Sequence, residues 1–135
     1  MVLTVTLNPA VDKTCRLNEL LLGQVNRLQS VMSVAGGKGV NVTKILRQFE
    51  YPVTAMGFIG GYTGQLIQER LTEMGAECHF TYIDQATRVS TNILADNGYV
   101  TSSPSMVSVS FGLLEISIAV IAPDFVCDLL VALIF

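Results

Sequence analysis

Apolar and polar positions alternate along the first hundred residues in a pattern that predicts strands and helices in turn. Runs rich in β-branched and aromatic residues predict strands, and apolar residues spaced three and four apart predict helices. The expected strands are Val2–Leu7, Val53–Ile59, Phe80–Ile83 and Arg88–Ala95, with extended chain over Arg27–Val34, and the expected helices are Val40–Glu50 and Gln65–Met74. Strand followed by helix, twice over, is typical of an α/β fold with a parallel sheet.

The two expected helices each present one apolar stripe that should pack on the sheet. The stripe of the first helix consists of Val42, Ile45, Leu46 and Phe49, and that of the second consists of Ile67, Leu71 and Met74, with Gly75 as a C-cap. The segment Thr14–Leu22 mixes apolar and polar residues without a clear period before Gly23 breaks it. This segment therefore predicts no regular element.

An antiparallel hairpin is expected after the second helix. Asp96, Asn97 and Gly98 separate the strand Arg88–Ala95 from the short apolar run Tyr99–Thr101. Asn-Gly between two β-rich runs is the strongest short-range hairpin signal. A hairpin does not fit a repeated strand–helix unit, so it predicts a small antiparallel flap beside the main sheet.

The last part of the chain has a different composition. Residues 102–105 are rich in serine, and Leu113–Phe135 is almost wholly apolar. Three acids and a proline interrupt that run, which makes it a poor membrane span, because a span needs about 20 residues with few or no charges. The alternative is a buried strand over Ile116–Ile121 and a short helix from Asp124. We therefore divide the chain into residues 1–101 and a divergent apolar tail, residues 102–135.

Composition limits the function classes. The chain has 135 residues, 50% of them hydrophobic and 14% charged, with a formal net charge of −3. It is too apolar for a disordered chain, and without a Lys/Arg run it lacks a nucleic-acid surface. Cys15, Cys78 and Cys127 form no C-x-x-C pair, and His79 has only Cys78 beside it. This favours reduced cytosolic thiols over disulfides or a metal site, and no signal peptide is recognisable.

The glycine-rich stretch Val34–Val42 is the first candidate site. Gly36 and Gly37 leave the backbone bare just before a helix begins, Lys38 adds a positive charge, and Asn41 adds an amide. Free N–H groups at a helix N-terminus attract anions, so this chemistry suits a phosphorylated polyol. The stretch is neither a P-loop nor a dinucleotide-binding motif, because the glycine spacing differs from both. A turn that binds nothing is the alternative.

Two charged residues outside this loop are further candidates. Asp12 follows Asn8-Pro9, which should end the first strand, and the carboxyl ends of strands are where open α/β sheets bind ligands. Arg88 begins the flap and could hold a phosphate with its forked guanidinium group. Taken alone, Asp12 is more often a solvated turn residue and Arg88 an exposed arginine at a strand edge, each without a ligand.

Taken together, these residues resemble the N-terminal part of a PfkB-type, ribokinase-like carbohydrate kinase. The resemblance is strongest to the branch that holds 1-phosphofructokinase and tagatose-6-phosphate kinase, and it covers about residues 1–101. It is carried by five blocks in the expected order and spacing: Leu3–Asp12, Gly23–Arg27, Ala35–Val42, Gly57–Gly64 and Thr87–Arg88.

The resemblance implies a ribokinase-like parallel sheet with a small antiparallel lid, and phosphoryl transfer from ATP with Mg²⁺ to a sugar hydroxyl. By this resemblance Asp12 binds sugar hydroxyls, and Arg88 clamps the phosphate already on the substrate. The sugar pocket would be lined by Gly36, Gly37, Lys38 and Asn41. The lid of such kinases often pairs with a second subunit, so a homodimer is implied, and the cytoplasm is the expected location.

The chain also departs from this family. The ATP site and the catalytic aspartate of such kinases lie in their C-terminal half, around a Gly-Ala-Gly-Asp motif that this sequence does not contain. We therefore expect no catalytic base, no metal ligand and no complete ATP site here. Residues 102–135 do not resemble the family's continuation, which suggests a frameshift or premature stop in a full-length kinase gene.

Three functions follow from these observations. The first is the sugar-binding part of a sugar-phosphate kinase, most similar to 1-phosphofructokinase, that is inactive alone. The second is a non-catalytic module that binds a sugar phosphate or dimerises through the lid strands. The third is a membrane-tethered peptide that uses Leu113–Phe135. The sequence cannot separate fructose 1-phosphate from tagatose 6-phosphate as the ligand.

Overall fold

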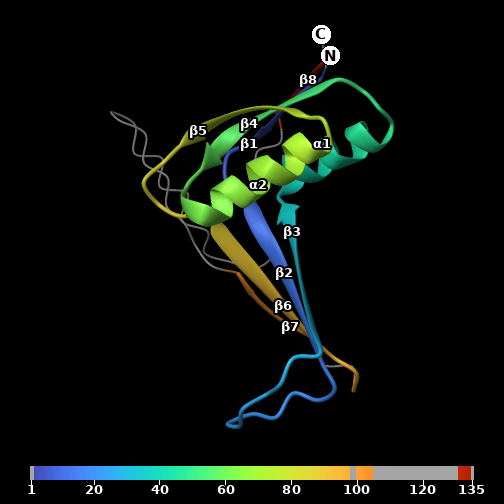
Figure 1. Ribbon diagram of the computed structural model, residues 1–135, viewed down its shortest axis with the longest axis vertical. Coiled ribbons are helices and arrows are strands. Elements are labelled where there is room, and N and C mark those ends of the chain that lie inside the picture. Colours follow the sequence, from blue (N-terminus) through green and yellow to red (C-terminus); the bar gives the residue numbers. More distant parts are fainter. Residues whose placement is uncertain (1, 98–99, 105–130, 135) are drawn as a thin grey trace.

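The computed structural model describes residues 2–97, 100–104 and 131–134, and these form two sheets and two helices (Figure 1). The core sheet consists of β1 (Val2–Thr6), β4 (Val53–Ile59), β5 (Glu77–Tyr82) and β8 (Val131–Ile134). The projecting sheet consists of β2 (Ala10–Leu17), β3 (Ser30–Gly36), β6 (Arg88–Ala95) and β7 (Val100–Pro104). The helices are α1 (Lys38–Gln48) and α2 (Gly61–Glu73).

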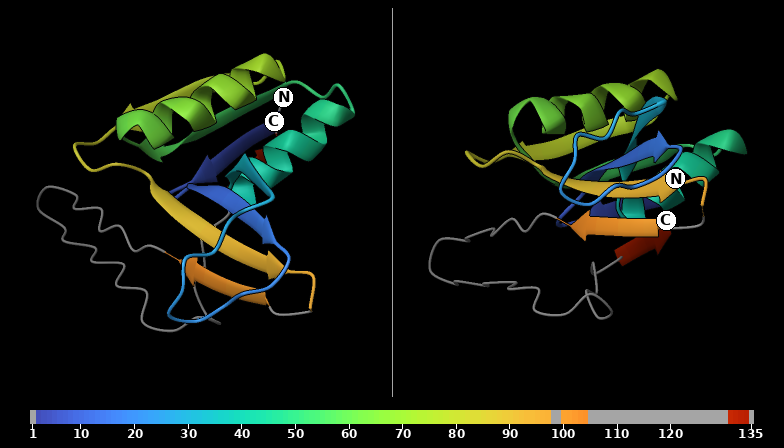
Figure 2. Two further views of the ribbon diagram at one scale, coloured as in Figure 1. Left: turned by 60° about the horizontal axis from the view of Figure 1, so that its bottom comes forward. Right: turned by 90° about the horizontal axis from the view of Figure 1, so that it is seen from below.

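The core sheet confirms the predicted parallel arrangement. Its strand order is β5-β4-β1-β8, in which β1, β4 and β5 run parallel and β8 runs antiparallel to β1. The strand predicted at Val53–Ile59 has those same bounds. Every second residue of it is buried, and the residues between them are partly or fully exposed. Both helices lie on one face of this sheet (Figure 2), so the predicted α/β fold is present.

The prediction for the second helix is confirmed, although the helix begins four residues earlier than expected. Ile67 and Leu71 are fully buried and belong to the core that forms against β4. Gly75 has a φ of 80° and directly follows the C-cap residue Met74, as expected for a glycine that ends a helix.

The apolar stripe predicted for the first helix is confirmed at Leu46, which packs against the core, and is wrong at Ile45 and Phe49. Ile45 is 52% exposed and Phe49 is 71% exposed, whereas Thr43 is fully buried. Thr43 is tolerated there because its hydroxyl donates to the carbonyl oxygen of Gly39 at 3.0 Å and lies 2.6 Å from the hydroxyl of Thr4 on β1. A buried threonine pair thus sets the contact between helix and sheet, and a count of apolar positions cannot detect it.

The projecting sheet is larger than the predicted flap. The hairpin of β6 and β7 is confirmed, with Leu94 opposite Val100. However, β2 and β3 also belong to this sheet, whose order is β3-β2-β6-β7. The absence of structure expected from Thr14 onward is therefore wrong, because β2 extends to Leu17 and pairs with β3 and β6 on its two sides. Pairing on both sides stabilises a strand whose own residue pattern is weak.

The chain passes between the two sheets at three places in the part that the structure describes. It leaves the core sheet after β1, returns from β3 into α1 through Gly37, and leaves again between β5 and β6. The carboxyl ends of the parallel strands face these crossings, because each of β1 and β5 is followed by a strand of the projecting sheet. The candidate residues of the sequence lie at this edge.

The predictions for Ile116–Ile121 and for a helix from Asp124 concern residues outside those described. The same holds for most of the apolar run Leu113–Phe135, of which only β8 is described. Within the described residues, neither helix has the length and apolar character needed to cross a membrane.

Candidate functional site

The glycine loop joins β3 to α1 as the sequence predicts. Gly37 is the N-cap residue of α1 and has a φ of 109°, a conformation that side chains other than hydrogen rarely allow. A Cβ atom at Gly37 would lie 3.0 Å from Cγ2 of Thr6 and 3.3 Å from Cα of Pro9. The loop therefore packs directly against the crossing between β1 and β2, and no side chain caps the helix.

Asp12 lies over the last residue of β3. A Cβ atom at Gly36 would lie 2.0 Å from Oδ2 of Asp12, so only glycine leaves room for the carboxylate. The strand register explains this approach, because Asp12 is paired with Val34 of β3 and the carboxylate reaches across to the residue two positions on. Asp12 is half-buried and belongs to β2 rather than to a turn.

Two cations flank this carboxylate, and each is anchored on a main-chain oxygen. Nη2 of Arg88 donates to the carbonyl oxygen of Asn8 at 3.2 Å. Nζ of Lys44 donates to the carbonyl oxygen of Ala35 at 2.6 Å. Burial raises the pKa of Asp12, and the positive charges of Lys44 and Arg88 act against that rise. The site therefore combines one carboxylate, two cations and bare backbone at one edge of the sheet.

Of the predicted site residues, the structure brings Asp12, Gly36, Gly37 and Arg88 together. Lys38 and Asn41 lie in the first turn of α1, directly after the loop, and both residues are exposed. A carboxylate can accept hydrogen bonds from sugar hydroxyls, and a guanidinium group can hold a phosphate with two parallel hydrogen bonds. The arrangement is thus chemically suited to a phosphorylated sugar.

Sequence reasoning missed Lys44. This residue follows Gly37 and Asn41 at helical spacing, so positions 37, 41 and 44 share one face of α1. That polar face could have been recognised from the same helical period that led to the apolar stripe. Lys44 places a second cation beside Asp12 without belonging to the glycine motif.

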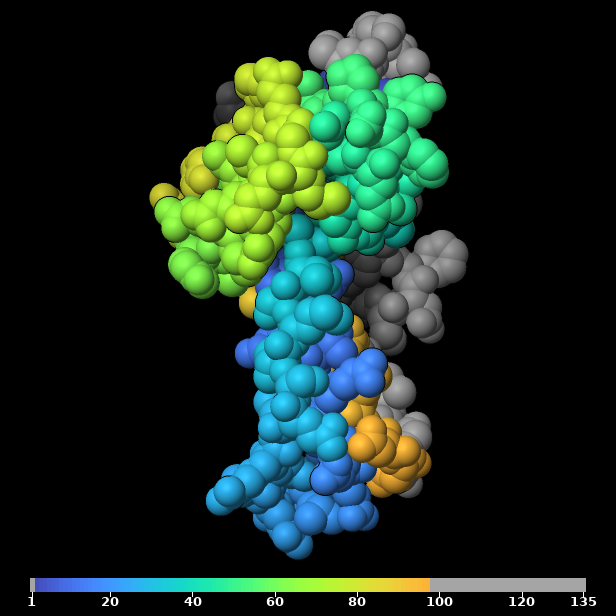
Figure 3. Space-filling view, turned by 45° about the vertical axis from the view of Figure 1, so that its right-hand side comes forward, coloured from blue at the N-terminus to red at the C-terminus, as the bar shows by residue number. Residues whose placement is uncertain are grey.

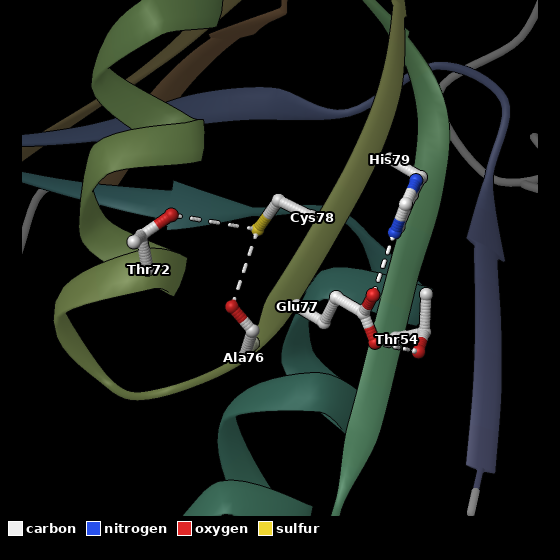
Figure 4. Close-up of polar contacts among 6 residues, drawn as sticks. All are labelled: Thr54, Thr72, Ala76, Glu77, Cys78 and His79. Carbon is white, nitrogen blue, oxygen red and sulfur yellow. Dashed lines mark hydrogen bonds and ion pairs between the residues drawn. The ribbon is translucent and has the colours of Figure 1, made fainter.

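Cys78 and His79 point to opposite sides of β5 (Figure 4). The thiol of Cys78 lies toward α2, 3.8 Å from the hydroxyl of Thr72, and burial raises its pKa. Nε2 of His79 lies 2.8 Å from Oε1 of Glu77, and this contact lowers the pKa of Glu77. His79 is a strand residue, as predicted. Among the described residues, no group of three His, Cys, Asp or Glu side chains is placed to hold a metal ion.

Comparison with known proteins identifies a family that shares these elements. Residues 5–102 match the model of the pfkB family carbohydrate kinases. A 1-phosphofructokinase from Haloferax volcanii is 43% identical over 99 residues, which is 73% of this chain and 32% of that protein. The chain thus spans about a third of the length of this curated relative.

Solved structures agree with the fold described above. A structure from Thermotoga maritima, described as a possible 1-phosphofructokinase, has a TM-score of 0.67 at 32% identity and covers 76% of this chain and 34% of that one. Phosphofructokinase-2 from Escherichia coli, solved with fructose 6-phosphate, has a TM-score of 0.67 at 21% identity and covers 80% and 36% of the two chains. The second likeness shows the fold alone, and the expected fold class is confirmed.

Replacing Asp12 with asparagine should raise the free energy of unfolding at pH 7. Because burial raises the pKa of Asp12, the folded state favours the protonated carboxyl, and stability falls as the pH rises through that pKa. The Asp12→Asn variant carries no charge at either pH, so its advantage should vanish below the ordinary pKa of 3.8. Urea denaturation at pH 7 and at pH 3 measures both differences.

The exposed Asp84 provides the control, because Asp84→Asn should change the free energy of unfolding by less than about 0.5 kcal/mol at both pH values. If Asp12→Asn is less stable than the parent at pH 7, the attraction of the two cations outweighs the burial of the carboxylate, and this account of Asp12 is wrong.

Replacing Lys44 with methionine should raise the pKa of Asp12 further, because one of the two charges that favour the ionised carboxylate is lost. The Lys44→Arg variant keeps a charge and should stay close to the parent. Carboxyl carbon NMR of Asp12 across a pH titration measures this directly. Lys13→Met is the matched control, since Lys13 is the next residue on β2 and points to the other face of the strand. An unchanged pKa in Lys44→Met contradicts the prediction.

Proposed function

The chain belongs to the pfkB family of carbohydrate kinases, and from this membership we propose that it binds a sugar phosphate as the N-terminal part of an ATP-dependent sugar-phosphate kinase. The intact enzyme would phosphorylate fructose 1-phosphate to fructose 1,6-bisphosphate, as the name of the Haloferax relative suggests. The observation that carries the proposal is the half-buried Asp12 carboxylate, which lies against Gly36 and between Arg88 and Lys44.

The proposed roles follow from the chemistry of each group. Asp12 accepts hydrogen bonds from sugar hydroxyls, because a carboxylate offers only acceptors. Arg88 holds the phosphate on the substrate, and its present hydrogen bond to the carbonyl oxygen of Asn8 keeps it at the crossing. The main-chain groups of Gly36 and Gly37 line the sugar, and Lys38 and Asn41 close the pocket from the start of α1.

ATP and Mg²⁺ are the cofactors that the family implies. The described residues offer Asp12 as the carboxylate of the site, and no set of three metal-ligating side chains accompanies it in residues 2–97. The sequence contains no Gly-Ala-Gly-Asp motif. From the missing motif we propose that this chain alone binds the sugar phosphate without transferring a phosphoryl group.

Tagatose 6-phosphate is the alternative ligand, because the chemistry of the site recognises a phosphate and hydroxyls rather than one sugar. A non-catalytic module that binds sugar phosphates is the alternative role. Both rest on the same residues as the main proposal, and titration with each of the two sugar phosphates separates them.

A second copy of this chain is the proposed partner. β3 forms one edge of the projecting sheet, and Val31, Met32 and Val34 on it are 48%, 60% and 41% exposed. In Figure 3 the strands β2 and β3 extend away from the two helices, and the chain that joins them lies at the far end. An open strand edge with exposed apolar residues favours pairing with another strand.

The chain should bind fructose 1-phosphate more tightly than fructose, because the proposed role of Arg88 is to bind the phosphate, which fructose lacks. Isothermal titration calorimetry with fructose 1-phosphate, tagatose 6-phosphate and fructose measures this preference. Arg88→Met should weaken binding of the preferred phosphate about 10-fold to 100-fold, since a hydrogen bond to a charged group contributes about 1.5–3 kcal/mol. Lys13→Met should bind as the parent does.

Equal binding of fructose and fructose 1-phosphate by the parent would contradict the roles given to Arg88 and the glycine loop. Mixing the chain with ATP, Mg²⁺ and fructose 1-phosphate should release no ADP. Release of ADP that depends on the sugar phosphate would show that the chain is a complete catalyst and would overturn the proposed division of roles.

Met32→Glu should shift the chain from dimer toward monomer, because the added charges would face one another across the paired edges. Light scattering coupled to size-exclusion chromatography measures the mass at several concentrations. Met56→Glu places the same charge on β4 of the core sheet, where Met56 is 39% exposed, and should leave the mass unchanged. A parent that is monomeric at all concentrations contradicts the proposed pairing.

A further inference from the structure

In the second glycine-rich stretch, Gly60–Gly64, other residues of the chain occupy the space beside the glycines. A Cβ atom at Gly60 would lie 2.1 Å from the carbonyl oxygen of Gln85, and one at Gly61 would lie 2.9 Å from Cβ of Ala86. The segment that leads from β5 to β6 therefore lies directly on the start of α2 (Figure 2). This stretch resembles a ligand loop in sequence, but its close contacts are with other residues of the protein itself.

Thr87 closes this contact with three hydrogen bonds. Its N–H donates to the carbonyl oxygen of Gly60 at 2.8 Å, and its Oγ1 accepts from the N–H of Gly60 at 2.9 Å. The hydroxyl of Thr63 donates to the carbonyl oxygen of Thr87 at 2.6 Å. Thr87 is 6% exposed, so these bonds are protected from water.

Arg88 is the next residue, and it begins β6 of the projecting sheet. Its backbone is paired with Ala10 of β2, and its guanidinium group donates to Asn8. Thr87 therefore lies between the core sheet and Arg88, whose positive charge acts on Asp12. A side chain follows the position of its own backbone, so a shift of Thr87 against Gly60 would move Arg88 against Asp12.

We propose that the Gly60–Gly64 stretch and Thr87 form a joint that fixes Arg88 in the sugar-phosphate site, which makes Thr87 a positioning residue. This inference rests on the proposed function, because it assigns Arg88 to the phosphate. It gives the glycine-rich start of α2 a structural role beside the candidate site. Thr87 does not touch the substrate, and its effect on binding passes through Arg88.

The test uses Thr87→Val, which has nearly the same shape but cannot accept the hydrogen bond from Gly60. Binding of fructose 1-phosphate to the full chain should weaken about tenfold, and Thr87→Ser should restore it. Thr72→Val is the matched control. Thr72 lies on α2, the helix that begins at the glycine-rich stretch, and its hydroxyl donates to the carbonyl oxygen of Gln68 on the protein surface. This variant should bind as the parent does.

A double mutant separates positioning from general damage to the fold. In the Arg88→Met background, Thr87→Val should cause no further loss of affinity, because the residue that it positions is gone. Two outcomes would overturn the inference. One is a double mutant whose fold-loss of affinity is the product of the two single losses, and the other is a Thr87→Val variant that binds as tightly as the parent. If Thr87→Val does not fold, Thr63→Val removes the bond to the carbonyl oxygen of Thr87 and should show the same dependence on Arg88.

A measurement without ligand distinguishes this inference from the proposed function. Hydrogen exchange of the Gly60 amide and the NMR signal of the Arg88 side chain should both change in Thr87→Val and return in Thr87→Ser. If the parent binds no sugar phosphate, the proposed function fails, and these two signals alone decide whether the joint positions Arg88. Unchanged signals for Arg88 in Thr87→Val would refute the joint itself.

Discussion

The contact between the Asp12 carboxylate and the bare Cα of Gly36 is the constraint on which the candidate site depends. Any side chain at position 36 would occupy the place of the carboxylate, since a Cβ atom there would lie 2.0 Å from Oδ2. The glycine allows the acidic side chain of β2 to lie where β3 turns into α1. The carboxylate thereby reaches a position between two cations, although its burial raises its pKa and disfavours its charged form.

The same edge of the core sheet holds all three described crossings to the projecting sheet, and a hydrogen bond holds each of them. Arg88 binds the carbonyl oxygen of Asn8 after β1, and Lys44 binds that of Ala35 before α1. Thr87 and Gly60 join the segment after β5 to the start of α2. Arg88, to which we assign the phosphate, thus also holds one of these crossings, so the proposed ligand binding and the placement of the projecting sheet share this contact.

Much of this architecture was predictable from local signals. Val53–Ile59 and Arg88–Ala95 were predicted with the bounds that the structure has, and the glycine residues marked both helix starts. The apolar stripe of α1 was wrong at Ile45 and Phe49, because Thr43 is buried in their place through hydrogen bonds rather than through apolar character. The whole of β2 was missed, because Asn8-Pro9 was expected to end the extended chain and because pairing with β3 and β6, rather than local propensity, stabilises this strand.

The sequence by itself determined the family, the fold class and the candidates Asp12, Gly36, Gly37 and Arg88, because glycine, proline and charged residues carry strong local information about turns and ligands. Only the tertiary structure decided which of these groups meet. It placed Lys44 beside Asp12, and it showed that Gly60 is hydrogen-bonded to Thr87. These contacts join residues 27 to 32 positions apart, and their distances depend on how the two sheets cross, which no local pattern of residues specifies.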